Sequence, residues 1–294
     1  MQKLEIYQSL WAMELRSPDR PERSHEESFH RVAEAGYDGL CIDPGADEIE
    51  EFRALLPLYD RFGLGCMVNA FPYRLDDMLP LLALANEFKA TLVNVIGGVM
   101  PLTAAAAVPV VERWMDDAEQ AGLPLLFETH RDSLLNDLYY TLQLLELAPD
   151  MRLCADLSHF VIDREMRAPI TATDQAHVER ILRQSDCFQG RVANREQVQV
   201  QIDFPQHQEW VAIFKGWWRS GMRSWRQRNA SNATLVFLCE LGPPPYAMTD
   251  RNRRELSDRW DEALQIRAWV RDIWRELEGE ERASDGRTEP AGGQ

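Results

Sequence analysis

Three carboxylates in this chain each close a short, mostly apolar run. They are Glu128, Asp156 and Glu240, after the runs 124–127, 152–155 and 235–239. An ionised carboxylate in such a position is costly unless a cation compensates its charge. For one carboxylate, a salt bridge to an arginine such as Arg131 or Arg191 is the simplest explanation. Three of them converging at one place would repel one another, which favours a bound divalent cation.

Two histidines lie close to these carboxylates along the chain. His130 is two residues past Glu128, so it shares the same face if the strand continues. His159 is three residues past Asp156, on the predicted turn, within reach of a substrate or a metal. The remaining histidines before the seventh strand are expected to be structural or surface residues: His25, His30 and His177.

Eight apolar runs alternate with longer stretches of helical periodicity, and this alternation is what must position the carboxylates. The runs are 4–9, 39–42, 64–69, 92–96, 124–128, 152–156, 187–192 and 235–240. Such alternation requires parallel strands joined by helical crossovers. Eight units in this length predict an α/β protein with a single (β/α)8 TIM barrel, whose reactive groups lie at the C-terminal ends of the strands. The rival architecture, an open doubly wound sheet, would usually carry a glycine-rich phosphate loop after the first strand, and residues 10–16 contain no glycine.

Two segments depart from the regular alternation. Residues 194–208 form a long polar loop after the seventh predicted strand. Residues 278–294 are low in hydrophobic residues and are expected to form a disordered tail. The predicted barrel domain therefore spans residues 1–277.

Composition and charge limit the classes of partner. The chain is 45% hydrophobic, which excludes wholesale disorder, and its formal charge is −16. Such an acidic surface repels phosphate backbones and anionic lipids, so we expect neither a nucleic-acid nor a membrane partner. No apolar run approaches the roughly 18–20 residues of a membrane span, and no signal-peptide pattern is present, so a cytoplasmic protein is expected. Five widely spaced cysteines without a CxxC pair are interpreted as buried, reduced thiols.

The motifs together resemble a known superfamily. Glu128 on the fifth strand, Asp156-x-x-His159 on the sixth and Glu240-x-Gly-Pro on the eighth are similar to the xylose-isomerase-like barrels. That group includes sugar-phosphate isomerases and epimerases, ketose 3-epimerases, inosose dehydratases and, more distantly, the type-IV apurinic endonucleases. The resemblance covers essentially residues 1–277, and its motifs are more specific for the superfamily than for any substrate.

The resemblance implies one divalent metal with four protein ligands, from strands five to eight. Glu128, Asp156 and Glu240 match three of them. The strand-seven ligand is normally a histidine in a motif resembling His-x-Arg-Val, and here Gln189 takes its place while Arg191 matches the arginine. An amide oxygen suits Mn²⁺ or Mg²⁺ better than Zn²⁺ or Co²⁺, so the former pair is favoured and the latter remains possible. A weakened or vestigial site also stays open.

The ketose-epimerase branch implies proton transfer through an enediolate stabilised by the metal. Glu128 and Glu240 match its acid/base pair, and His159 matches a histidine that contacts the substrate. The resemblance further points to substrate contacts from His130, Arg191 and Tyr246, the last on a proline-rich loop. The partner would be a small sugar, sugar phosphate or cyclitol, and the chain could form a homo-oligomer.

Three other functions remain open at this stage. A lyase of the inosose-dehydratase kind would use the same site to eliminate water. A metal-dependent endonuclease needs three metals, more histidines and a basic face, which the charge opposes; the Trp- and Arg-rich stretch 217–228 is instead predicted to be a crossover helix with its tryptophans inward. A catalytically silent, ligand-binding barrel is the third, and Gln189 is the best argument for it.

Overall fold

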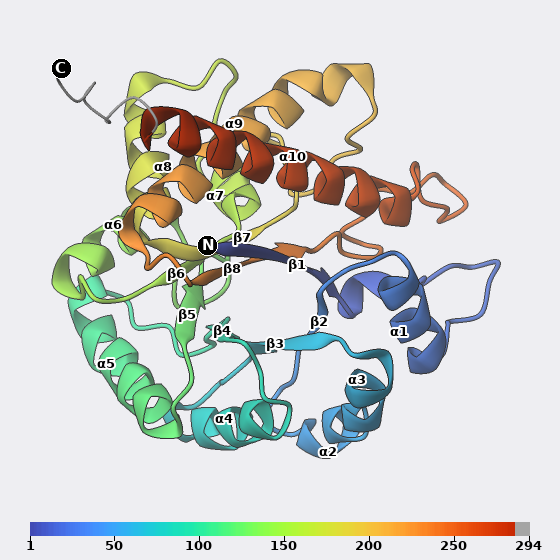
Figure 1. Cartoon of the computed structure of the whole chain (residues 1–294), viewed down its shortest axis with the longest axis horizontal. Helices are drawn as coiled ribbons and strands as arrows, with labels where there is room; N and C mark the ends of the chain where they lie inside the picture. The colour runs from blue at the N-terminus through green and yellow to red at the C-terminus, as the bar shows by residue number, and fades with distance from the viewer. Residues whose placement is uncertain (286–294) are drawn as a thin grey trace, which may run out of the picture.

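Eight parallel strands close into one barrel in chain order, and helices surround it (Figure 1). The computed structural model describes residues 1–285. The strands are β1 (Lys3–Ser9), β2 (Gly39–Ile42), β3 (Gly65–Ala70), β4 (Val93–Val95), β5 (Leu125–Glu128), β6 (Leu153–Ala155), β7 (Ser185–Gln189) and β8 (Thr234–Cys239). The predicted (β/α)8 barrel is therefore confirmed. Each predicted run overlaps one strand, although β7 begins two residues earlier and ends at Gln189.

The helices follow the strands as the alternation predicts. They are α1 (His25–Glu34), α2 (Ile49–Arg53), α3 (Leu56–Phe62), α4 (Met78–Glu87), α5 (Ala104–Ala121), α6 (Leu138–Leu147), α7 (Leu157–Asp163), α8 (Ala172–Gln184), α9 (Gln208–Arg228) and α10 (Arg259–Asp285). Three short 3-10 helices join them: η1 (Trp11–Met13), η2 (Leu75–Asp77) and η3 (Pro205–His207). No helix among residues 1–285 combines the length and apolarity that a membrane crossing requires.

Local sequence signals determine where several of these helices begin and end. Ser24 and Glu27 form a reciprocal capping box at the start of α1, which satisfies backbone N–H groups that the helix itself cannot. Thr103 caps α5 more simply: its side-chain oxygen accepts a hydrogen bond from the Ala106 backbone amide. That helix ends at Gly122, whose φ of 71° is a left-handed conformation that glycine adopts without steric cost.

The barrel interior is a separate, small apolar layer inside the ring of strands. Its members are Tyr7, Cys41, Met67, Leu92, Leu126, Cys154, Cys187, Val236 and Leu238. Tyr7 is accommodated because neighbouring strands have glycine beside it: a Cβ at Gly65 would lie 2.2 Å from its hydroxyl oxygen. All five cysteines are buried and unpaired, as the cysteine pattern predicts. This layer supports the strand ends on which the polar residues lie.

The tryptophan- and arginine-rich helix α9 packs its aromatic rings inward. Trp217 and Trp218 are almost completely buried, and Arg219 pairs with Glu276 and Glu280 of α10. The interpretation of residues 217–228 as part of a crossover helix with its tryptophans inward is therefore confirmed. Its Arg219 already has carboxylate partners within the chain.

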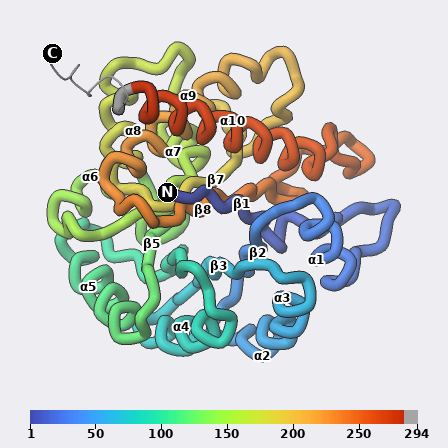
Figure 2. The backbone as a smooth tube through the Cα atoms, viewed as in Figure 1, coloured from blue at the N-terminus to red at the C-terminus, as the bar shows by residue number. Residues whose placement is uncertain are grey.

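The C-terminal helix extends further than the sequence suggests. Helix α10 continues to Asp285 and lies alongside α9 (Figure 2), so residues 278–285 of the expected tail are helical. Glu280 accepts a hydrogen bond from Arg223 at 2.9 Å and Glu281 accepts one from Arg226 at 2.8 Å. These ion pairs anchor a polar segment that composition alone assigns to a tail. The rest of the expected tail, 286–294, lies outside the described residues.

The long loop after β7 is confirmed, but it is packed rather than solvated. Val200 and Ile202 are buried within it. The Gln199 side chain donates to the Gly242 carbonyl at 3.0 Å and accepts from the Gly242 amide at 2.8 Å. This reciprocal pair attaches the loop to the segment after β8, which carries one of the site carboxylates.

Candidate active site

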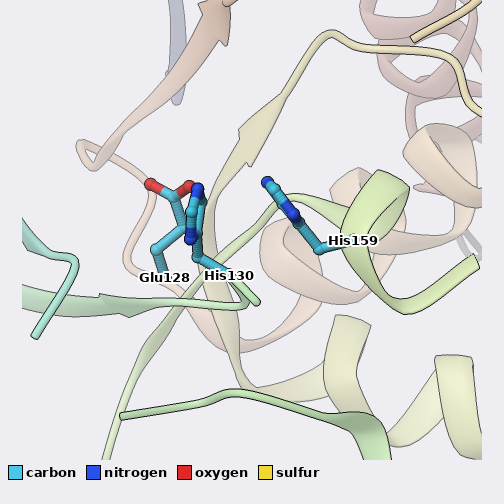
Figure 3. A group of neighbouring side chains, drawn as sticks. All are labelled: Glu128, His130 and His159. Carbon is cyan, nitrogen blue, oxygen red and sulfur yellow. The ribbon is translucent and has the colours of Figure 1, made fainter. Parts of the chain in front are cut away.

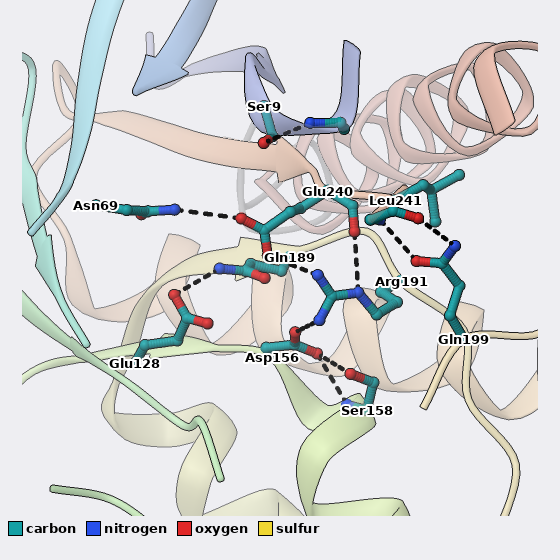
Figure 4. Close-up of polar contacts among 12 residues, drawn as sticks. Ser9, Asn69, Glu128, Asp156, Ser158, Gln189, Arg191, Gln199, Glu240 and Leu241 are labelled. Atoms are coloured by element: carbon teal, nitrogen blue, oxygen red, sulfur yellow. Dashed lines mark hydrogen bonds and ion pairs between the residues drawn. The ribbon is translucent and has the colours of Figure 1, made fainter. Parts of the chain in front are cut away.

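The carboxyl groups of Glu128, Asp156 and Glu240 meet at the C-terminal mouth of the barrel (Figure 4). Glu128 ends β5, Asp156 follows β6 and caps α7, and Glu240 follows β8. One oxygen from each lies within 4.8 Å of the others, and all three side chains are buried. Parallel strands force this meeting, because their carboxyl ends all emerge at the same rim.

A single buried arginine lies between two of these carboxylates. Arg191 donates from Nη1 to Asp156 and from Nη2 to Glu240, each at 2.7 Å, and from Nε to the Glu240 carbonyl at 3.0 Å. The salt-bridge explanation therefore holds in part, for two carboxylates that share one guanidinium. Their charges raise the pKa of Arg191 despite its burial. Three carboxylates and one arginine still leave an excess of negative charge.

Glu128, the carboxylate without an arginine, is held by two amides. Asn94 and Gln189 both donate to its Oε2, the latter at 2.7 Å. Within the described chain, Oε1 of Glu128 and Oε1 of Gln189 are buried without any hydrogen-bond partner. Two unsatisfied oxygens at the mouth are a place where a cation would be stabilised.

Burial dominates the electrostatics of the two glutamates. Loss of solvation, followed by the nearby charges of Glu240 and Asp156, raises the pKa of Glu128 well above its usual range. Loss of solvation also raises the pKa of Glu240 to about 7, against the opposing effect of Arg191. Both shifts express the same crowding of like charge in a dry environment.

Three polar residues of this network were not identified from the sequence. Asn69 on β3 donates to Asp43 at 2.8 Å and to Glu240 at 3.2 Å, and Asn94 on β4 donates to Asn69 at 2.9 Å. Asp43 follows β2 in the same pattern as the three carboxylates above, so the same signal could have found it. Asn69 and Asn94 each lie within an apolar run and carry no charge. A search for charged residues at strand ends therefore does not select them.

The two predicted histidines lie against each other beside this network, with their rings tilted by 46° (Figure 3). Their ring centroids are 3.9 Å apart, and His159 Nε2 lies 3.4 Å from Asp156 Oδ2. Loss of solvation lowers the pKa of His130 to about 4 and that of His159 well below its usual value, so both rings are neutral at neutral pH. Glu128, His130 and His159 form a second group whose ligand atoms lie within 4.8 Å of one another. The structure thus adds His130 to the possible metal ligands, beside His159.

Tyr246 covers the arginine from the loop after β8. Its ring centroid is 5.1 Å from the Arg191 guanidinium and 5.4 Å from that of Arg131. It also meets the ring of Trp11 edge-on at 5.2 Å. Gly242 permits this contact, because a Cβ there would lie 2.4 Å from the Trp11 ring. Tyr246 therefore lies at the rim of the site.

Some of these residues line a mouth cavity of about 460 Å³, whereas Asp156, His159 and Gln189 are not part of its lining. Its lining is Trp11, Asp43, Gly45, Asp47, Glu48, Phe71, Tyr73, Ile96, Glu128, His130, Arg191, Glu240 and Tyr246. That set contains five carboxylates and one arginine, so the mouth cavity is strongly acidic. Its size suits a small organic molecule.

The donor set at the mouth fits a divalent cation. Glu128, Asp156, Glu240 and the Gln189 amide offer oxygen atoms only, which hard ions such as Mg²⁺ and Mn²⁺ prefer. The alternative set with His130 and His159 adds nitrogen atoms, which suit Zn²⁺. Both sets share Glu128.

Sequence comparisons find no relative, whereas structural comparison finds many. No family model and no curated protein matches the chain. Its structure is similar to that of a xylose isomerase-like TIM barrel protein from Mycobacterium smegmatis in complex with magnesium, with 16% identity, a TM-score of 0.59 and coverage of 93% of this chain and 97% of that one. It is also similar to L-ribulose 3-epimerase, with 15% identity, a TM-score of 0.59 and coverage of 97% and 99%.

A third similar structure is that of the probable 3-DHS dehydratase involved in petrobactin synthesis from Bacillus anthracis. It is 14% identical, with a TM-score of 0.53 and coverage of 80% of this chain and 92% of that one. At these identities the likeness establishes the fold and not the reaction. The chain therefore has the fold of the xylose-isomerase-like TIM barrels, as the motifs predict.

Proposed function

We propose that this protein is a metal-dependent isomerase or epimerase that transfers a proton on a small, uncharged hydroxyketone. The observation that carries the proposal is the meeting of Glu128, Asp156 and Glu240 in one buried cluster that a single arginine does not neutralise. A structural salt-bridge cluster would balance its charges, and this one leaves Glu128 with an unsatisfied oxygen. Epimerases among the similar structures support the same reaction class.

Glu128 and Glu240 are the acid/base pair in this proposal. Oε1 of Glu128 is the free position at which a substrate proton can be received, because its Oε2 already accepts from Asn94 and Gln189. Those two amides hold the carboxylate in a defined orientation. Glu240 is oriented in the same way by Asn69 and Arg191.

His159, His130, Arg191 and Tyr246 would hold the substrate. The neutral imidazoles can donate or accept a hydrogen bond with a hydroxyl group. Arg191 also positions Asp156 and Glu240, since it bonds both. Its substitution should therefore disturb the site even where the substrate does not touch it.

A divalent cation would be held by Glu128, Asp156, Glu240 and the Gln189 amide oxygen, with Mn²⁺ or Mg²⁺ favoured over Zn²⁺ or Co²⁺. When bound, it would supply Lewis acidity that stabilises negative charge on neighbouring substrate oxygens. The chain's own contribution is to keep those oxygen donors buried and oriented.

The charge of the mouth cavity narrows the substrate class. Five carboxylates and one arginine line it, and burial with the crowding of like charge already raises the pKa of Asp43, Glu128 and Glu240, so a phosphate group there would add a further negative charge to a crowded site. A neutral ketose or cyclitol satisfies the same polar groups through its hydroxyls. We therefore place uncharged sugars ahead of sugar phosphates.

A lyase that eliminates water is the second candidate, supported by the similarity to a probable dehydratase. Metal-depleted protein reconstituted with Mn²⁺ or Mg²⁺ and incubated in D₂O with a panel of ketoses and inososes separates the functions. An isomerase or epimerase incorporates deuterium at carbon and forms an isomer, as mass spectrometry and NMR can show. A lyase yields a product lighter by one water. If neither appears with any metal, the proposal is wrong and a silent binding barrel is favoured.

A further inference from the structure

A second cavity of about 400 Å³ lies near the mouth cavity, since the segments 11–12 and 244–246 contribute residues to both. It is formed by the segment after β1, residues 12–23, and by Pro244 with residues 253–260 after β8. Six arginines line this arginine cavity: Arg16, Arg20, Arg23, Arg253, Arg254 and Arg259. Its carboxylates are only Asp19, Glu255 and Asp258, so its formal charge is +3 in a chain whose net charge is −16. Chance placement in such an acidic chain would give the opposite sign.

Three of these arginines are already engaged. Arg259 uses all its donor nitrogens on Glu255 and on the carbonyls of Ala12, Glu14 and Leu241, which fastens the two loops together. Arg254 pairs with Asp19 at 2.7 Å, and Arg16 pairs with Glu14 at the same distance. These contacts hold together the loops that form the arginine cavity.

The other three arginines have almost no partners. Among residues 1–285, the guanidinium groups of Arg20 and Arg253 make no hydrogen bond or ion pair, and that of Arg23 donates only to the Met13 carbonyl, at 3.2 Å. Arg23 is half-buried, and loss of solvation together with the charges of Arg31, Arg20 and Arg259 lowers its pKa. Positive charge is therefore crowded here, and the nearby Asp258 offsets it only in part at Arg23.

The loop that carries Arg253 is built to hold it in place. Asp250 accepts from the backbone amides of Asn252 and Arg254 at 2.7 and 3.0 Å, and its own amide donates to the Arg254 carbonyl. Arg253 itself has a φ of 63°, a left-handed conformation that a non-glycine residue adopts at a small steric cost. A defined turn thus presents the side chain, rather than a loose loop.

We propose that the arginine cavity binds a small oxyanion of the phosphate class, with Arg20, Arg23 and Arg253 as its ligands. Guanidinium groups match the geometry of phosphate oxygens with paired hydrogen bonds. Such an anion would neutralise the cavity and join the segments after β1 and β8. Two sources share this chemistry: a free inorganic anion, or the phosphate of a larger molecule.

The test is calorimetric titration of the full chain with inorganic phosphate at low ionic strength. We expect saturable binding to wild-type protein and at least about a tenfold loss in Arg20→Ala/Arg253→Ala, because charge-assisted pairs are lost. Arg61→Ala/Arg275→Ala is the matched control: it removes the same charge from exposed arginines that pair elsewhere, and its affinity should stay within about twofold of wild type. Circular dichroism verifies that each protein, including the two single variants, is folded.

Absence of saturable phosphate binding by wild-type protein, or equal binding by Arg20→Ala/Arg253→Ala, would overturn the proposal. If phosphate binds as expected, titration with fructose 6-phosphate and with fructose identifies the source of the anion. Tighter binding of the sugar phosphate than of phosphate, with competition by fructose, assigns the site to part of a larger ligand. Equal binding without competition assigns it to a free anion. These measurements need no turnover, so their failure is distinct from failure of the proposed isomerase function.

Discussion

Two neighbouring cavities of this barrel carry opposite charge although the same two loops contribute to both. The mouth cavity has five carboxylates and one arginine, and the arginine cavity has six arginines and three carboxylates. Trp11 and Tyr246 belong to the first, whereas Ala12 and Pro244 belong to the second. Adjacent residues of one loop thus face chemically different spaces.

The two cavities also differ in how their charges are held. Glu128, Asp156 and Glu240 are at most 5% exposed, at strand ends that the barrel hydrogen bonds fix. Arg20 and Arg253 lie on exposed loops. Charges in the dry mouth interact strongly, whereas those of the loops are screened by water and salt. The buried mouth is therefore suited to hold a cation and to transfer a proton. The arginine cavity is suited to bind an anion reversibly.

The largest effect should come from removing a charge at the mouth. Glu240→Gln keeps the shape of the side chain but cannot exchange a proton, so we expect turnover to fall by at least about 10³-fold with the fold intact. Steady-state assays and a thermal melt measure the two quantities. Glu48→Gln, at the exposed rim of the same cavity, is the control and should retain most activity. Undiminished turnover by Glu240→Gln would remove this residue from the mechanism.

Removing the counter-charge tests how far the mouth depends on its arginine. Arg191→Met leaves Asp156 and Glu240 buried without their cation and should lower the free energy of unfolding by about 3–5 kcal/mol. Urea denaturation measures the loss. Added Mn²⁺ should restore part of it, since a cation at the mouth compensates the same carboxylates. Arg195→Ala removes a half-buried arginine whose partners, Glu165 and Glu196, are exposed, and should cost less than about 1 kcal/mol. A loss no larger than this control would show that the cluster needs no counter-charge.

Gln189→His sharpens the question of which cation the mouth accepts. An imidazole is a better ligand than an amide for Zn²⁺ and Co²⁺, so their affinities should rise by about tenfold or more, while that for Mg²⁺ changes little. Isothermal titration of both proteins gives the comparison. Metal binding by neither protein would favour a silent barrel. Unchanged zinc affinity in the variant would instead favour the group of Glu128, His130 and His159, which does not use residue 189.

The smallest effect should separate the two cavities by their response to salt. Raising NaCl from about 50 to about 200 mM shortens the screening length and should weaken phosphate binding at the arginine cavity severalfold. Metal binding at the buried mouth should change less, because little salt reaches it. Calorimetry at both concentrations provides the numbers. Equal salt dependence for the two ligands would contradict the contrast between a buried and an exposed site.

Much of the framework was accessible from the sequence because its signals are local. Apolar runs and helical periodicity identify the eight strands, and the polar residues that end three runs identify Glu128, Asp156 and Glu240. Asp43 follows the same rule and was overlooked. Asn69 and Asn94 carry no charge and lie within apolar strands, so the pattern offers little reason to select them.

The segment 278–285 shows the limit of composition as a guide. Its sequence is polar, and an isolated polar segment gains little by becoming helical. In the folded chain, Glu280 and Glu281 meet arginines of α9 that are more than fifty residues away in the sequence. Partners at that separation cannot be identified from a single sequence without knowing how the helices pack.

The sequence by itself determined the barrel, the order of its strands and the rim at which its carboxylates emerge, since each follows from periodicity and the direction of parallel strands. Only the tertiary structure decided which groups neutralise one another. Arg191 serves two carboxylates from different strands, and Arg20 and Arg253 come from segments more than two hundred residues apart to share one cavity. The physical reason is that electrostatic energy depends on distance and burial, and both are properties of the folded chain.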